Sequence, residues 1–176
     1  MASVFTHPVV PLALAVAMGR SRVSLPLLAV GIVASVLPDL DVVGFRLGIP
    51  YTSDYGHRGF THSLVFAAVV AGIATLGAAW WRSSRAATFG FVFVACASHG
   101  LLDMLTNAGR GVAYFWPFTN QRYFLPIRVI EASTLSFSRF FHITGGEVLR
   151  SEVLWVWLPC LAVALVARTI RRSNAL

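Results

Sequence analysis

The sequence predicts an all-α protein: a multi-pass transmembrane helical bundle of about five helices, with a long, partly irregular outer loop. Two observations support this fold class. Hydrophobic residues make up 57% of the 176 residues and charged residues only 12%, whereas soluble domains average about 25% charged residues. The apolar residues also form separate runs, with no low-complexity stretch typical of a linker between them. We therefore expect one domain over residues 1–176 that is surrounded by the lipid bilayer.

The expected helices are the apolar runs 8–19, 24–37, 64–81, 86–105 and 153–167. The third and fourth runs approach the ~20 residues that a bilayer crossing requires, while the first two are short for a full span and favour a buried hairpin. Pro8 and Pro26 fit the preference for proline in the first helical turn. We expect the first helix to be retained, because no basic residue precedes it as in a cleaved signal peptide.

The arginines predict how the helices are oriented. All 14 basic residues are Arg, and the formal net charge is +7. Seven of them lie in short loops or in the C-terminal tail, namely Arg20, Arg22, Arg82, Arg85, Arg168, Arg171 and Arg172. The positive-inside rule places these segments in the cytoplasm, so loops 38–61 and 106–151 face outward from a cell (inner) membrane. Because the arginines are dispersed rather than clustered on one element, we expect no nucleic-acid partner.

Histidines and aspartates gather on the predicted outer side. A helix rises about 1.5 Å per residue, so depth can be counted from the arginines at the other end. His7 and His99 come out about 20 Å above the inner face, and Asp41, His62 and Asp103 roughly 27 to 30 Å above it. Four helices therefore deliver nitrogen and oxygen donors into one layer about 10 Å thick. This pattern predicts a metal site near the outer face.

Local spacing also suits metal coordination. His99 and Asp103 are four residues apart and share one helix face. If the backbone around Asp39 and Asp41 is extended, both carboxylates point the same way, because strand side chains alternate with a period of two. If the backbone is helical, the two carboxylates point in different directions. A carboxylate within a membrane helix costs a few kcal/mol and is by default paired or functional.

An ion-pair network without metal is the alternative interpretation. Arg46 or Arg58 could neutralise the aspartates. That scheme explains the carboxylates and leaves four histidines unexplained, so we favour the metal site. The two cysteines, Cys96 and Cys160, lie in apolar runs and imply neither a disulfide nor a thiolate site.

Three segments resemble the YdjM-like family of bacterial membrane-bound metal-dependent hydrolases. They are LPDLD at 37–41, HRGFTHSL at 57–64 and SHGLLDMLT at 98–106. The resemblance extends to the N-terminal His7, to residues 109–117 and 122–126, and to Ser151 and Glu152. It implies the following metal ligands: His7, Asp39, Asp41, His57, His62, His99 and Asp103. Some relatives place a histidine after the Asp-x-Asp pair, where this chain has Val42, so the number of ligands and metals stays open.

The resemblance also implies an activity, because the family is distantly similar to zinc-dependent phospholipase C and related nucleases. We therefore expect one or two divalent ions, most simply zinc, which would lower the pKa of a bound water to about 7. Asp39 or Asp41 would orient that water, and Arg58 and Arg122 would bind a phosphate oxygen. The depth of the site favours a lipid or lipid-linked phosphoester as the substrate.

Two other function classes remain open at this stage. Intramembrane aspartates and histidines also build metal or proton transporters, but the inner halves of these helices contain almost no ionisable residue apart from the flanking arginines. A non-catalytic membrane protein with a structural metal would show a closed coordination shell. His142 and Glu147 match no motif, and we expect His142 to be a surface residue.

Overall fold

The computed structural model describes residues 1–134 and 140–174. The α-helices are α1 (Val9–Met18), α2 (Leu25–Val36), α3 (Val43–Arg46), α4 (Leu64–Thr75), α5 (Arg85–Met104), α7 (Gly145–Glu152) and α8 (Leu158–Ser173). Two 3-10 helices, η1 (Leu37–Val42) and η2 (Phe60–His62), and two π-helical turns, η3 (Phe140–Thr144) and η4 (Val153–Trp157), join them. The described residues contain two isolated β-bridges and no strand. The all-α prediction is confirmed.

Three continuous helical segments are long and apolar enough to cross a membrane: Leu25–Arg46, Arg85–Met104 and Phe140–Ser173. Helices α1 and α4 are apolar but shorter. The predicted bundle is therefore confirmed, while individual lengths differ from the sequence interpretation. The second run continues through η1 and α3 to 22 residues, and the third run is helical for only 12.

The early end of α4 has a side-chain cause. The Trp81 indole N–H donates a hydrogen bond of 2.9 Å to the carbonyl of Ala74, in the last turn of the helix. A Cβ at Gly77 would lie 2.6 Å from the Trp81 ring, so only glycine leaves room for this fold-back. The indole is thus a second donor to a carbonyl that also accepts the Gly77 backbone N–H at 3.1 Å. Run length alone could not predict this turn.

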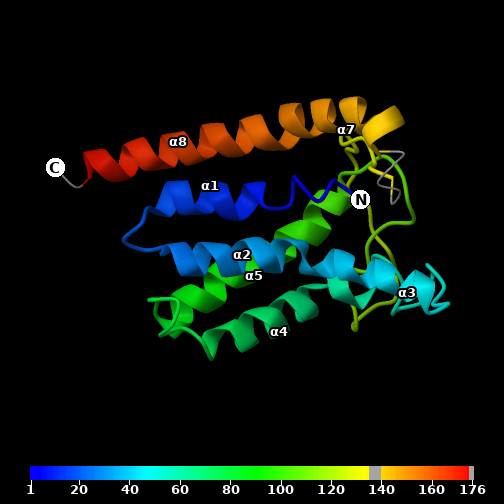
Figure 1. The fold of residues 1–176 in the computed structure, drawn as a ribbon, viewed down its shortest axis with the longest axis horizontal. Helices are drawn as coiled ribbons and strands as arrows, with labels where there is room; N and C mark the ends of the chain where they lie inside the picture. The colour runs from blue at the N-terminus through cyan, green and yellow to red at the C-terminus, as the bar shows by residue number, and fades with distance from the viewer. Residues whose placement is uncertain (135–139, 175–176) are drawn as a thin grey trace.

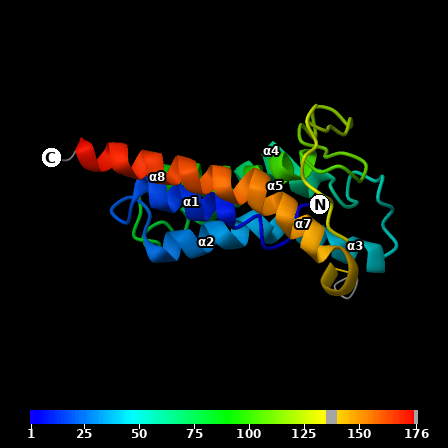
Figure 2. The same ribbon diagram turned by 90° about the horizontal axis from the view of Figure 1, so that it is seen from above.

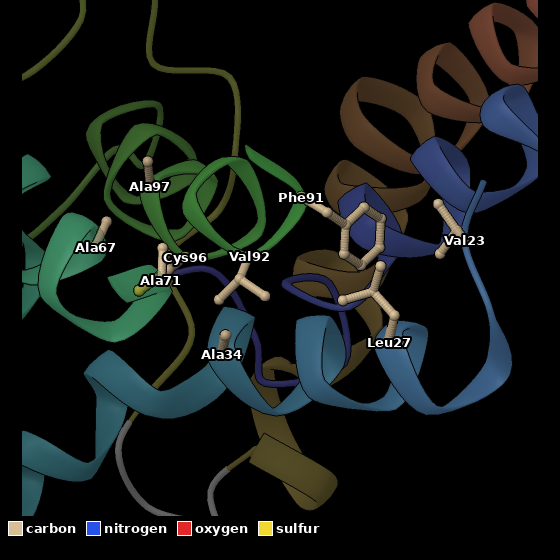
Figure 3. Packing of buried hydrophobic residues seen from close by; sticks show 9 residues of the cluster. All are labelled: Val23, Leu27, Ala34, Ala67, Ala71, Phe91, Val92, Cys96 and Ala97. Atoms are coloured by element: carbon tan, nitrogen blue, oxygen red, sulfur yellow. The ribbon is translucent and has the colours of Figure 1, made fainter. Parts of the chain in front are cut away.

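Helix α5 lies at the centre of the bundle, against α2 and α4, while α8 packs along α1 (Figure 1). Figure 3 shows Val92 and Cys96 of α5 packed among small residues of α2 and α4. Ala34, Ala67 and Ala71 are almost fully buried, and small residues at such contacts let membrane helices approach closely.

The two ends of the bundle differ in structure and charge. The α1–α2 turn, the α4–α5 turn and the C-terminus lie at one end, and they carry the seven arginines of the short loops (Figures 1 and 2). The N-terminus, α3 and the irregular chain of residues 105–134 lie at the other end. The histidine and aspartate side chains belong to this second end, as the helix counting predicts. The orientation of the ends across the membrane stays a prediction.

Candidate metal centre

Four side chains from three elements bring one donor atom each within 4.8 Å of one another. We call Asp39, His62, His99 and Asp103 the inner group. Asp39 comes from η1, His62 from η2, and His99 and Asp103 from one face of α5. Residues 60 positions apart along the chain thus meet at the end of the bundle where helix counting places them.

The distances within the inner group suit a small divalent ion. His99 Nε2 lies 3.1 Å from His62 Nε2 and 3.4 Å from Asp39 Oδ1. His62 Nε2 lies 3.8 Å from Asp39 Oδ1 and 3.7 Å from Asp103 Oδ2. Ligands bound tetrahedrally at about 2.1 Å are roughly 3.4 Å apart. The donors therefore already have nearly the spacing of a coordination shell.

His7, from the chain segment before α1, lies next to the inner group. Its Nε2 lies 3.8 Å from Asp39 Oδ2 and 4.0 Å from Asp103 Oδ1, and its ring stacks on His99 with centroids 3.6 Å apart. Burial lowers the pKa of His7 to about 3 and also lowers that of His62. Both imidazoles are therefore neutral at pH 7, as metal ligation requires.

The inner group and His7 contain buried polar atoms that make no hydrogen bond within the described part of the chain. They are both ring nitrogens of His7, both carboxylate oxygens of Asp39 and Oδ2 of Asp103. An unsatisfied buried polar group costs about 1–3 kcal/mol, and a charged one more. A divalent cation would satisfy these atoms and offset the carboxylate charge, so the residues present fit a metal.

Contacts of Nδ1 orient the rings of two histidines so that Nε2 faces the inner group. His99 Nδ1 donates to the carbonyl of Ser35 at 2.7 Å, so the lone pair of Nε2 faces the inner group. His62 Nδ1 lies 3.3 Å from Asp41 Oδ2, which leaves its Nε2 for the same group. Metal-binding histidines usually donate their other ring nitrogen to a carbonyl or carboxylate in this way.

Asp41 and His57 form a neighbouring group that shares His62 with the inner group. The Asp41 carboxylate accepts hydrogen bonds from Thr61 Oγ1 at 2.8 Å and from the backbone N–H of Arg58 at 3.1 Å, and it lies 2.6 Å from His57 Nδ1. Asp41, His57 and His62 could themselves hold a second ion. The seven predicted ligands therefore divide between two adjoining groups.

The backbone of η1 explains this division. Asp39 and Asp41 lie in a 3-10 helix, where side chains two residues apart point in different directions. Of the two backbones considered from sequence, the extended one is wrong and the helical one is confirmed. Pro38, which cannot donate to the preceding helical turn, marks the point where α2 tightens into η1.

The two arginines predicted to bind phosphate have protein partners instead. Arg58 is fully buried: its Nε lies 3.0 Å from Asp103 Oδ2, and its other nitrogens donate to Thr106 Oγ1 and to the carbonyl of Ala108. Arg122 donates to three backbone carbonyls of residues 51–57. Arg58 thus supplies the positive partner that sequence analysis expected for an aspartate, and it compensates one carboxylate of the inner group.

Glu152 is a part of the site that sequence reasoning did not identify. This fully buried carboxylate accepts hydrogen bonds from the Ser3 hydroxyl at 2.6 Å, from the Thr6 hydroxyl at 2.8 Å and from the Ser3 backbone N–H. It thereby ties the segment that carries His7 to the last long helix. A glutamate within an apolar helix was the available signal, but residue counting placed Glu152 with the outer loop.

The family described as YdjM inner membrane protein matches residues 1–175. The chain belongs to the YdjM family. Inner membrane protein YbcI of Escherichia coli (strain K12) is 41% identical to this YdjM-family chain over 160 residues, which cover 90% of the chain and 92% of the relative.

Inner membrane protein YdjM, from Escherichia coli (strain K12) and from Shigella flexneri, is 35% identical over 138 residues. These residues cover 73% of this YdjM-family chain and 64% of each relative. No solved structure is significantly similar. The names of the relatives and the apolar helices confirm the prediction of an inner membrane protein.

Proposed function

We propose that this YdjM-family protein is a metal-dependent hydrolase that cleaves a phosphoester, with zinc as the metal. The observation that carries the proposal is the inner group with His7 beside it, where the carboxylates of Asp39 and Asp103 and the ring of His7 hold buried atoms without a hydrogen-bond partner among the described residues. A mixed set of imidazole and carboxylate donors is typical of zinc sites. The phosphoester follows from the family resemblance described above, and the positive-inside rule places the centre near the outer face of the membrane.

The residues would have distinct roles. His7, His62, His99 and Asp103 would hold the ion, which would supply a water of lowered pKa and polarise the scissile bond. Asp39, at 8% exposure the most accessible member of the inner group, would accept the proton of the attacking water. Asp41 is occupied by protein donors, so its role would be to position His62. If a second ion binds, Asp41 and His57 would be its ligands.

Transport is the weaker alternative. A transporter needs a polar route between both faces of the membrane. Apart from the Cys96 thiol, no ionisable side chain lies on α1, α2 or α4, or on the part of α5 between Arg85 and His99. The arginine end of the described helices therefore lacks a relay to the centre.

The direct test is hydrolysis by purified protein. The full chain in detergent, supplied with zinc, would be incubated with phospholipids and lipid phosphates, and phosphate-containing products would be measured. We expect turnover that a chelator abolishes and that falls at least 100-fold in His99→Ala, since this variant loses a metal ligand. His142→Ala removes an exposed histidine and is the matched control. Equal turnover by His99→Ala and the control would refute the assignment.

A further inference from the structure

An apolar pocket of about 330 Å³ adjoins the metal centre. Its walls come from the N-terminal segment, the end of α2, η1, residues 133–134 and the start of η3. Most of the lining side chains are apolar: Val4, Phe5, Val36, Leu40, Phe140 and Phe141. Asp39 also lines it, so we call it the Asp39 pocket. Its volume lies within the range of roughly 300–1,000 Å³ typical of small-molecule sites.

The Asp39 pocket gives access to the candidate metal centre through Asp39. The other members of the inner group are at most 2% exposed, and His7 is fully buried, whereas Asp39 is 8% exposed. Both carboxylate oxygens of Asp39 are also without a hydrogen-bond partner in the described chain. The other large pockets found on described residues are lined by no residue of the inner group.

The rim of the pocket favours entry from the bilayer. Val4 and Phe5 are each 48% exposed, Leu40 is 64% exposed and Phe141 is 57% exposed. Apolar side chains exposed together in this way mark a surface that contacts lipid or a partner rather than water. The pocket therefore joins an ionic centre to an apolar opening, and an amphipathic molecule matches both parts.

We propose that the Asp39 pocket binds the hydrocarbon chain of the substrate, which enters sideways from the membrane. The substrate class is then a phosphoester whose phosphate carries an apolar chain directly beside it. This inference rests on the proposed function for the reaction, while the pocket itself can be tested by binding alone. Relative to the probe free in water, each methylene group that enters the pocket would tighten binding about fourfold, the equivalent of ~0.8 kcal/mol of apolar burial, until the pocket is full.

The probes are n-alkylphosphonates of four, eight and twelve carbons, which present phosphate-like oxygens and cannot be hydrolysed. Their dissociation constants would be measured on the full-length, zinc-loaded protein in lipid nanodiscs. Val36→Phe fills the pocket from the end of α2 without altering a residue of the centre. Val33→Phe makes the same change one turn earlier, at a residue that lines a different pocket, and corrects for partition of the probe into lipid.

We expect the four-carbon probe to bind wild type, Val33→Phe and Val36→Phe with the same affinity. From four to twelve carbons, the gain in affinity should be at least 30-fold larger for wild type and Val33→Phe than for Val36→Phe. Equal dependence on chain length in Val36→Phe and Val33→Phe would overturn the proposal. Zinc content of both variants, measured in the same samples, shows that the centre is intact. Chain-dependent binding without any zinc-dependent hydrolysis would refute the hydrolase and leave the apolar-chain site standing.

Discussion

At the scale of single residues, the centre is defined by which atom of each side chain remains available. His99 and His62 each present Nε2, because Ser35 and Asp41 occupy or face the other ring nitrogen. Asp41 has no such freedom, since three protein donors lie around its oxygens. Residues of one type therefore differ in role through their partners.

Asp41→Asn tests the positioning role of this carboxylate. We expect zinc affinity to fall 10- to 100-fold, because loss of a carboxylate behind a metal-bound histidine typically weakens binding by that factor. Zinc dissociation constants would be measured by competition with a chromogenic chelator. Asp54→Asn, in the irregular chain that follows α3, is the control. A loss as severe as that of His99→Ala would place Asp41 among the direct ligands, and an unchanged affinity would remove it from the site.

Arg58→Gln tests charge compensation at Asp103. Without Arg58, a fully buried carboxylate loses its ion-pair partner at 3.0 Å, and breaking such a pair costs about 3–5 kcal/mol. We expect the zinc-free variant to be destabilised by about that amount in reversible unfolding, whereas Arg46→Gln, which changes an exposed arginine, stays near wild type. Zinc should restore part of the loss, because the cation replaces the missing charge. Equal stability of the two variants would contradict this role.

At the scale of elements, the centre depends on how segments are held together. Helix α5 provides two donors through its own periodicity, since His99 and Asp103 are one turn apart. His7 has no such support and lies in a segment outside the helices. Glu152 supplies the support by binding Ser3 and Thr6, and the Ala2 N–H donates to Asp103 at 2.7 Å.

Glu152→Gln should therefore weaken zinc binding although Glu152 is not a ligand. We expect about a tenfold loss of affinity, because a loosened N-terminal segment no longer holds His7 at the centre. Hydrogen exchange of residues 2–7 should speed up in parallel. Glu147→Gln changes an exposed glutamate on the same helix and serves as control.

A double variant separates positioning from general damage. In the His7→Ala background, Glu152→Gln should cause little further loss of zinc affinity, because both changes remove the same contribution. Additive losses would show that Glu152 does not act through His7.

At the scale of the whole molecule, charge and polarity divide the bundle into two ends. The arginines of the short turns and the C-terminus lie at one end, and the metal centre with its irregular chain lies at the other (Figure 1). The positive-inside rule predicts that the arginine end is cytoplasmic. The Asp39 pocket, which opens beside the centre, would then take its ligand from the outer part of the bilayer.

Labelling of single cysteines tests this orientation. In a background with Cys96 and Cys160 replaced by alanine, Asn120→Cys and Asn174→Cys place one thiol at each end of the molecule. A membrane-impermeant maleimide should label Asn120→Cys in cells whose outer membrane alone has been opened. Asn174→Cys should react only after the inner membrane is permeabilised. The reverse pattern would put the metal centre on the cytoplasmic side.

The helical membrane fold, the arginine end and the layer in which His7, His62, His99 and Asp103 meet could all be predicted from the amino-acid sequence. These features follow from composition and from the fixed rise of a helix, which are local properties of the chain. The apolar runs did not determine where helices end, because the fold-back of Trp81 onto Ala74 overrides hydropathy.

Which atoms face one another could be learned from the folded structure alone. It separated Asp39 from Asp41, paired Arg58 with Asp103 and gave Glu152 its role at the N-terminus. It also placed the Asp39 pocket beside the one accessible carboxylate of the inner group. The physical reason is that each of these contacts joins segments distant in sequence, and the energy of a buried charge depends on those partners rather than on its neighbours along the chain.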